Sequence, residues 1–178
     1  MHTESIVDGP GIRLSIYVQG CPHHCPGCHN PETHDPAGGY KAGLGEVTAL
    51  LDRHSDGLNG VTISGGEPFE QAAPLAVLAA EILKRGLDLV LYSGYTFEEL
   101  FSKSKSNRDI RFLLEAGRLL VDGPFILDEQ DLDLAYRGSR NQRLIDLPVS
   151  LRSCEAVEWE LAGSFDSGSQ AQGFSLAP

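Results

Sequence analysis

The alternation of strand and helix patterns restricts the fold of this chain more than any other feature of its sequence. Short runs of β-branched and apolar residues predict strands at residues 14–18, 61–63, 87–92 and 118–121. Apolar residues at helical spacing predict helices at residues 45–55, 75–83 and 110–114. Repeated strand–helix units with short links imply a parallel sheet with right-handed crossovers. We therefore expect an α/β fold. Because the chain is too short for eight such units, a partial (β/α) barrel or an open sheet fits best.

Length and charge narrow the class of protein. The 178 residues suit one domain, which we place at residues 1–154, and the Gly-, Ser-, Gln- and Ala-rich stretch within residues 155–178 is typical of a flexible tail. A net charge of −11 opposes binding to the phosphates of nucleic acids. The sequence has neither an apolar run of membrane-spanning length nor a signal-peptide pattern, so we expect a cytoplasmic protein without a membrane segment.

Unusual residues follow four of the predicted strands at the point where each strand ends. They are Cys21, Gly65-Gly66-Glu67, Ser93-Gly94 and Asp122-Gly123. The carboxyl ends of parallel strands meet at one edge, where α/β folds bind their ligands. We therefore expect these four segments to surround a common site.

Three clustered cysteines give the strongest chemical signal. Cys21, Cys25 and Cys28 lie within eight residues, in a loop that also contains two prolines and a glycine. Thiolates suit zinc or an iron–sulfur cluster, and spacing alone does not separate the two. A zinc site would take its fourth ligand from the nearby histidines, which are His23, His24, His29 and His34. Cys154 lies outside this group, and we expect no role for it.

The order of the motifs resembles that of a known superfamily. A CxxxCxxC loop after one strand and Gly-Gly-Glu-Pro after the next is the pattern of the radical S-adenosylmethionine enzymes. Five motifs resemble, more narrowly, the activating proteins of anaerobic, class III ribonucleotide reductases. These motifs are residues 5–13, 21–32, 92–95, 121–125 and 136–143, and the resemblance runs from about Glu4 to Leu147.

The resemblance implies a fold, two cofactors and a reaction. The fold would be a short radical S-adenosylmethionine partial barrel, with Cys21, Cys25 and Cys28 holding a [4Fe-4S] cluster that leaves one iron open. S-adenosylmethionine would bind that iron and be cleaved, with one electron, to methionine and a 5′-deoxyadenosyl radical. The radical would generate a glycyl radical on an anaerobic ribonucleotide reductase. A low-potential donor such as flavodoxin or ferredoxin would supply the electron.

The same resemblance assigns cofactor contacts. It places Gly27, Cys28 and His29 against S-adenosylmethionine, and Gly65, Gly66 and Glu67 around its methionyl amino group. A side chain at Gly66 is then expected to block the cofactor while sparing the more distant cluster ligands.

For several other residues, two interpretations stay open. Ser93 and Asp122 can bind the cofactor or a nearby cation, or they can cap the strand ends. Arg137, Arg140 and Arg143 can contact a partner protein or form a solvated turn. Residues 8–13 are expected to shape the rim of the pocket. The family usually has a strand before residues 4–6, so here that strand is expected to be truncated or missing.

Rival functions remain open at this point. In the same class, the chain could activate another glycyl-radical enzyme, or act on a small molecule as a deazapurine-synthase-like radical enzyme. In a different class, it could be a zinc-binding module without catalysis.

Overall fold

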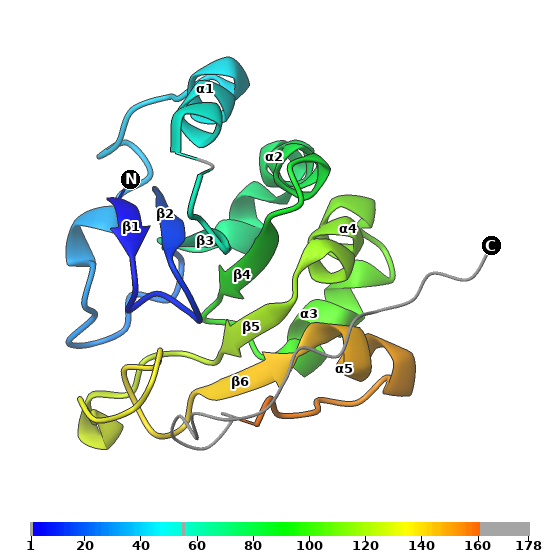
Figure 1. Ribbon diagram of the computed structural model, residues 1–178. Coiled ribbons are helices and arrows are strands. Elements are labelled where there is room, and N and C mark those ends of the chain that lie inside the picture. Colours follow the sequence, from blue (N-terminus) through cyan, green and yellow to red (C-terminus); the bar gives the residue numbers. More distant parts are fainter. Residues whose placement is uncertain (1, 55, 161–178) are drawn as a thin grey trace, which may run out of the picture.

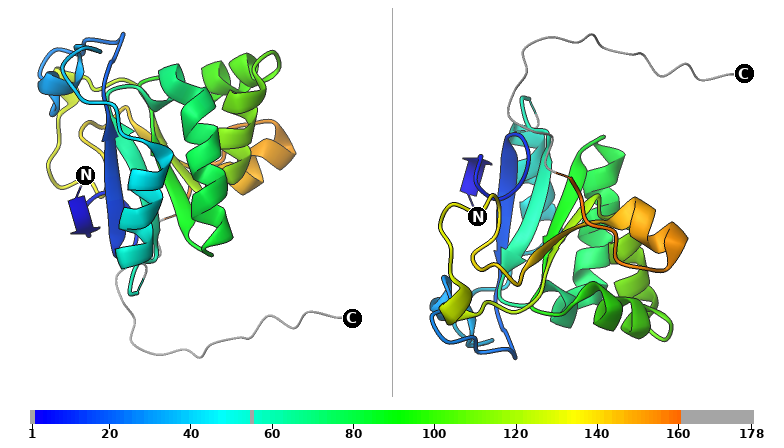
Figure 2. Two further views of the ribbon diagram at one scale, coloured as in Figure 1. Left: turned by 90° about the horizontal axis from the view of Figure 1, so that it is seen from above. Right: turned by 90° about the horizontal axis from the view of Figure 1, so that it is seen from below.

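The structure, a computed structural model, describes residues 2–54 and 56–160. A six-stranded sheet in the order β1-β2-β3-β4-β5-β6 forms its centre, and the described α-helices lie together on one face of this sheet (Figures 1 and 2). The strands are β1 (His2–Ser5), β2 (Arg13–Val18), β3 (Gly60–Gly65), β4 (Asp88–Tyr92), β5 (Leu119–Asp122) and β6 (Arg143–Asp146). The α-helices are α1 (Leu44–His54), α2 (Ala72–Lys84), α3 (Phe97–Ser104), α4 (Arg108–Ala116) and α5 (Leu147–Ser153). Three 3-10 turns complete the elements: η1 (Pro31–Thr33), η2 (Pro68–Gln71) and η3 (Leu127–Glu129).

Side chains alternate along the strands and divide between two apolar clusters. On the helix-covered face, strand residues such as Leu14, Ile63 and Leu91 pack with the apolar stripes of the helices and form the main core. The other face carries a smaller cluster made by Val90, Leu119, Val121 and Leu144. Burial of apolar surface is the main favourable term in folding, so the helix-covered face supplies most of the stability.

The face without helices is covered by loops. The backbone carbonyl of Asp8 accepts a hydrogen bond from the Thr62 hydroxyl, so residues 6–12 cross this face at β3. The carbonyl of Tyr136 accepts one from the Tyr92 hydroxyl, which places the loop of residues 123–142 over the end of β4. These two loops leave polar groups, rather than a helix, facing this side of the sheet.

The predicted α/β class is confirmed, and each predicted strand and helix overlaps an observed one. The expected parallel sheet is correct only for β2 to β5, because β1 and β6 pair antiparallel with β2 and β5. Parallel neighbours need a crossover connection that is usually a helix. The described loops 6–12 and 123–142 contain no α-helix, so each returns the chain in the opposite direction.

The structure describes both ends of the expected domain in more detail. The strand expected to be truncated or missing has a four-residue counterpart, β1, which covers the edge of β2. The expected tail starts at residue 155, yet its first six residues pack on the sheet. The Trp159 amide donates to the carbonyl of Leu144, and Glu158 forms an antiparallel bridge with Ile145. The rest of that segment, residues 161–178, lies outside the described residues.

Candidate functional site

The cysteine loop begins where β2 ends and folds back on itself. The amide of Gly20 donates to the carbonyl of Thr33 at 2.8 Å, and the amide of Cys21 donates to that of His34 at 3.2 Å. Gly20 has φ +96°, a left-handed conformation that glycine adopts without strain. The parallel register of β2 with β3, and of β3 with β4, brings the next two strand ends beside this loop. The predicted meeting of strand ends is therefore present.

The three loop thiols are half-buried and free of disulfides. The Cys28 amide donates to the Cys25 carbonyl, which tightens the turn between them, and the Asn30 amide donates to the Cys28 sulfur at 3.4 Å. Burial raises the pKa of the Cys21 thiol and the charge of Glu67 adds to this, although backbone hydrogen bonds at His23 oppose the shift.

The three loop thiols form a donor set that fits an iron–sulfur cluster. Among the described residues, no three His, Cys, Asp or Glu side chains are grouped so that they could hold one metal ion. A closed zinc site needs four donors about 2.0–2.3 Å from one atom. A cluster takes one cysteine for each iron, so its thiols surround a larger body and need not converge on a point. Three free, soft thiol donors in one loop fit a cluster on these grounds.

The two glycines after β3 allow close packing between chain segments. A Cβ at Gly65 would lie 2.6 Å from the backbone nitrogen of Val18, and Gly65 itself has φ +99°. A Cβ at Gly66 would collide with the backbone carbonyl of Gly20, next to Cys21. The Gly66 amide also donates to the carbonyl of Val18 at 2.8 Å. A side chain at Gly66 would therefore displace the start of the cysteine loop, so the expectation that it would spare the cluster ligands is corrected.

Glu67 connects three of the converging segments. Its carboxylate is fully buried and accepts hydrogen bonds from the amide of Phe69 at 3.0 Å and the amide of Gly94 at 2.8 Å. The Ser93 hydroxyl donates to both carboxylate oxygens at 3.0 and 3.1 Å, and His23 Nε2 donates at 3.1 Å. Glu67 thus fastens the ends of β3 and β4 to the cysteine loop. Sequence reasoning placed His23 among the zinc candidates and missed this contact.

Asp122 lies at the end of β5 and has structural partners. Its buried carboxylate forms an ion pair with the guanidinium of Arg143 and accepts a hydrogen bond from the Phe97 amide at 2.7 Å. Arg143 also pairs with Glu98 at 2.8 Å, and these two carboxylates raise the pKa of its guanidinium further. Of the two interpretations for Asp122, the contacts in the structure are those of strand-end capping. Arg143, which pairs with both Asp122 and Glu98, therefore has a structural role.

The last part of the cysteine loop packs against the loop of residues 123–142. A Cβ at Gly27, which has φ +72°, would lie 2.7 Å from the side chain of Leu127. The ring of His29 lies 4.9 Å from that of Phe125, and its Nε2 lies 3.4 Å from the Gln130 amide. The predicted cofactor contacts Gly27 and His29 therefore lie at the junction of these two loops.

A buried polar network lies under residues 8–13, where only a rim was expected. Asp8 accepts hydrogen bonds from the hydroxyls of Ser5, Ser15 and Tyr17. Arg13 is fully buried and forms an ion pair with Asp88. These contacts anchor the loop of residues 6–12 to the sheet. The polar residues at alternate positions of β2 were the sequence signal for this network.

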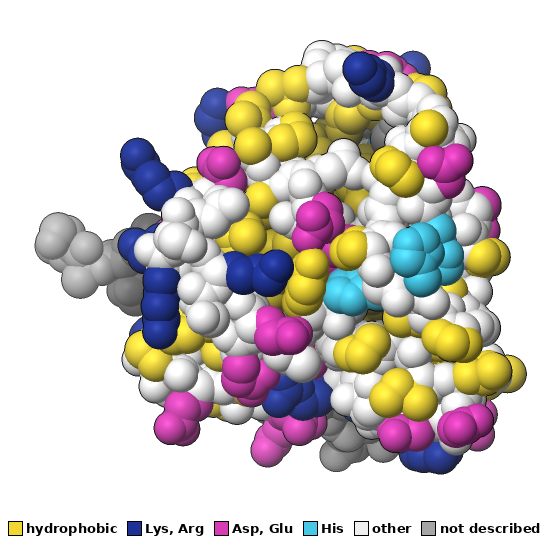
Figure 3. All heavy atoms as spheres, turned by 180° about the vertical axis from the view of Figure 1, so that it is seen from behind, with side chains coloured by type: hydrophobic (Ala, Val, Ile, Leu, Met, Phe, Trp, Pro, Cys, Tyr) yellow, Lys and Arg dark blue, Asp and Glu magenta, His cyan; other side chains and the backbone are white. Residues whose placement is uncertain are grey.

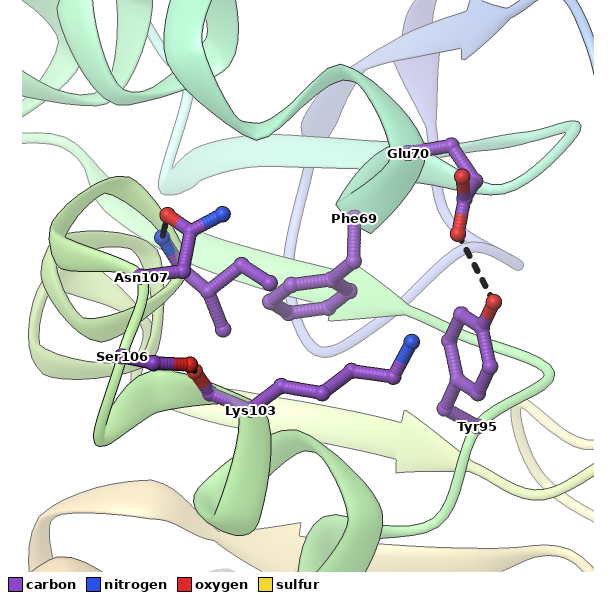
Figure 4. Close-up of a pocket in the computed structure, with 7 residues that line it drawn as sticks. Phe69, Glu70, Tyr95, Lys103, Ser106 and Asn107 are labelled. Atoms are coloured by element: carbon purple, nitrogen blue, oxygen red, sulfur yellow. Dashed lines mark hydrogen bonds between the residues drawn. The ribbon is translucent and has the colours of Figure 1, made fainter.

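Two hollows adjoin the site. A groove of about 1200 Å³ opens beside Cys21, with walls from β2, residues 34–42, α1 and α2. The face seen in Figure 3 is hollowed in its upper part among hydrophobic side chains, and histidines lie nearby. A smaller pocket of about 350 Å³ lies between η2, α3 and α4 (Figure 4). There Tyr95 donates to Glu70 at 2.7 Å, and the ammonium of Lys103 lies 4.1 Å from the Tyr95 ring centre.

Comparison with known proteins identifies the family of the chain. The sequence model of a family described as "4Fe-4S single cluster domain" matches residues 7–145. The anaerobic ribonucleoside-triphosphate reductase-activating protein of Escherichia coli K12 is 32% identical over 150 residues, covering 77% of this chain and 90% of the relative. The chain belongs to this family of reductase-activating proteins.

Other members of the family match over a similar length. The protein of the same name from Pasteurella multocida is 35% identical over 150 residues, covering 77% of this chain and 89% of the relative. That of Enterobacteria phage T4 is 30% identical over 145 residues, covering 78% and 86%. The family resemblance drawn from the motifs is thereby confirmed.

No described helix combines the length and apolar character needed to cross a membrane.

Proposed function

We propose that this chain is a cytoplasmic iron–sulfur activase that installs a glycyl radical on an anaerobic, class III ribonucleotide reductase. One observation carries the proposal. Three free thiols lie at the edge where parallel strand ends meet, in a chain that matches a 4Fe-4S single cluster domain over residues 7–145. Relatives named as activators of the anaerobic reductase support the choice of partner.

The chain's own residues would hold the two cofactors. We assign three irons of a [4Fe-4S] cluster to the three loop cysteines and leave the fourth iron to S-adenosylmethionine. When bound, this pair would supply the one-electron reductive cleavage of S-adenosylmethionine, which would provide the radical needed to abstract a hydrogen atom from a backbone glycine. The Asn30 amide, by donating to the Cys28 sulfur, would stabilise the thiolate form of that ligand.

Glu67 would hold the segments that form the site in fixed relative positions. Its buried bonds to His23, Ser93 and Gly94 fix the start of the cysteine loop against the ends of β3 and β4. A cofactor held between these segments requires them to keep fixed positions, since small misplacements of reacting groups reduce rates strongly. Gly65 and Gly66 let the segments approach closely enough for this.

The substrate would enter as a segment of another protein. We interpret the curved arrangement of β1 to β6 as a short partial barrel whose loops, residues 6–12 and 123–142, leave little chain to enclose a large substrate. A backbone glycine presented by the reductase meets this requirement. A low-potential donor such as flavodoxin or ferredoxin would reduce the cluster.

Product analysis tests the proposal. Anaerobically reconstituted protein, reduced with dithionite, should convert S-adenosylmethionine to methionine and 5′-deoxyadenosine. Addition of the cognate reductase should produce a glycyl-radical doublet in electron paramagnetic resonance. Cleavage of the cofactor by a fully loaded protein without a radical on the reductase, but with turnover of a small metabolite, would assign the chain to the small-molecule enzymes. A colourless protein that binds zinc tightly and no iron would refute the activase.

A further inference from the structure

The loop of residues 123–142 and the start of β6 carry three arginines with different surroundings. Arg143 pairs with two carboxylates, and Arg140 lies 3.8 Å from Asp131 with its side chain 57% exposed. Arg137 differs from both. In the described part of the chain its guanidinium has no carboxylate partner, and its single hydrogen bond goes from Nη1 to the carbonyl of Gln142 at 3.3 Å.

The neighbours of Arg137 place it at the candidate site. The carbonyl of Tyr136, the preceding residue, accepts a hydrogen bond from the Tyr92 hydroxyl at the end of β4. A Cβ at Gly138, the following residue, would lie 2.9 Å from the ring of His29 in the cysteine loop. Arg137 therefore lies between the end of β4 and the last part of the cysteine loop, on the sheet face that the described helices leave open.

The guanidinium of Arg137 has an unused donor. Its Nε is buried without a hydrogen-bond partner, one of three such side-chain atoms among the described residues. A second of them, Oδ1 of Asn141, belongs to the same loop. A buried, unpaired polar group is costly, and a guanidinium carries a forked set of donors that matches a carboxylate in a bidentate pair.

We propose that Arg137 binds the α-carboxylate of the methionyl part of S-adenosylmethionine. This inference rests on the proposed function, because it requires that the cofactor bind at this edge. The carboxylate is the only anionic group of S-adenosylmethionine, whose sulfonium and ammonium groups are positive. Arg143, the other arginine held at this edge, is already neutralised by Asp122 and Glu98. Arg137 is thus a specificity-determining residue that favours the amino-acid form of the cofactor.

A binding cycle tests this assignment. The affinity of cluster-loaded protein for S-adenosylmethionine and for its decarboxylated form is measured by equilibrium dialysis, without oxygen or reductant. Arg137→Gln should weaken binding of the intact cofactor about ten- to a hundredfold, the effect of a lost charge-assisted bond, and should leave binding of the decarboxylated form nearly unchanged. Arg137→Lys should recover part of the loss. Arg140→Gln, a matched change three residues away, should alter neither affinity.

The ratio of the two affinities makes each outcome decisive. Because both ligands are measured on one preparation, loss of correctly folded protein cancels from the ratio. An unchanged ratio in Arg137→Gln overturns the assignment, as does an equal loss of both ligands or an effect confined to activation of the reductase. If loaded wild-type protein bound no S-adenosylmethionine, the proposed cofactor itself would be wrong, which is a separate result.

Discussion

Glu67→Gln tests whether the buried carboxylate joins the segments of the site. Glutamine keeps the size of the side chain but replaces one accepting oxygen with a donating NH2 group. If the nitrogen takes the place of Oε1, it faces the Phe69 amide, and if it takes that of Oε2, it faces the Gly94 amide and His23. In either orientation at least one buried donor loses its acceptor.

The size of the effect follows from these contacts. An unsatisfied buried donor costs about 1–3 kcal/mol, and the remaining bonds weaken because they are no longer charge-assisted. Removal of a buried charge offsets part of this loss. We therefore expect the free energy of unfolding to fall by about 2–3 kcal/mol. For a chain of this size, the corresponding fall in Tm is about 4–12 °C.

Urea unfolding of the cluster-free protein, followed by circular dichroism, measures this loss without any contribution from bound iron. Glu70→Gln is the matched control, since Glu70 is exposed and, among the described residues, its side chain makes one hydrogen bond, which it accepts from the Tyr95 hydroxyl and which an amide oxygen can still accept. The control should change stability by less than about 1 kcal/mol. Equal midpoints and slopes for Glu67→Gln and wild type would show that the buried network does not hold the segments together.

Three further predictions concern the ligands, the glycine pair and pH. Alanine at any of the three loop cysteines should remove most bound iron, whereas Cys154→Ala should retain it because Cys154 is exposed and far along the chain; iron and sulfide analysis decides this. Gly66→Ala should lower both thermal stability and iron content, because its Cβ collides with the Gly20 carbonyl, while Gly43→Ala meets no atom within 4 Å and should change neither. Burial, with the charge of Asp8, raises the pKa of Tyr17 to about 12. This folded-state pKa lies above the unfolded value of 10.0, so the contribution of Tyr17 to the free energy of unfolding is complete below pH 10 and is lost as the pH rises towards 12. Tyr17→Phe should therefore flatten the alkaline fall in stability, measured by urea unfolding.

Much of the fold could be predicted because its signals are local. The apolar stripe of α2 and the run of β-branched residues in β3 belong to one short segment each, so both can be recognised without knowledge of tertiary contacts. Helix α3 was missed although Thr96 and Glu99 form a capping box, a signal that is readable in the sequence. Strand β6 was also missed, and its antiparallel direction depends on the long loop before it.

The sequence by itself determined which chemical groups are available and roughly where they lie. The glycines and other unusual residues at the strand ends are local information that indicated the edge of the sheet carrying the site. The family was indicated by the resemblance of five short motifs to known proteins, and each of these motifs is local as well. The partners of the charged groups were decided only by the tertiary structure. His23 reaches Glu67 across 44 positions, and Asp122 reaches Arg143 across 21. Such pairs form only when separate segments pack together, and no local preference encodes that packing. For the same reason, Arg137 could be distinguished from Arg140 and Arg143 only once the loop that carries it had been placed against β4 and the cysteine loop.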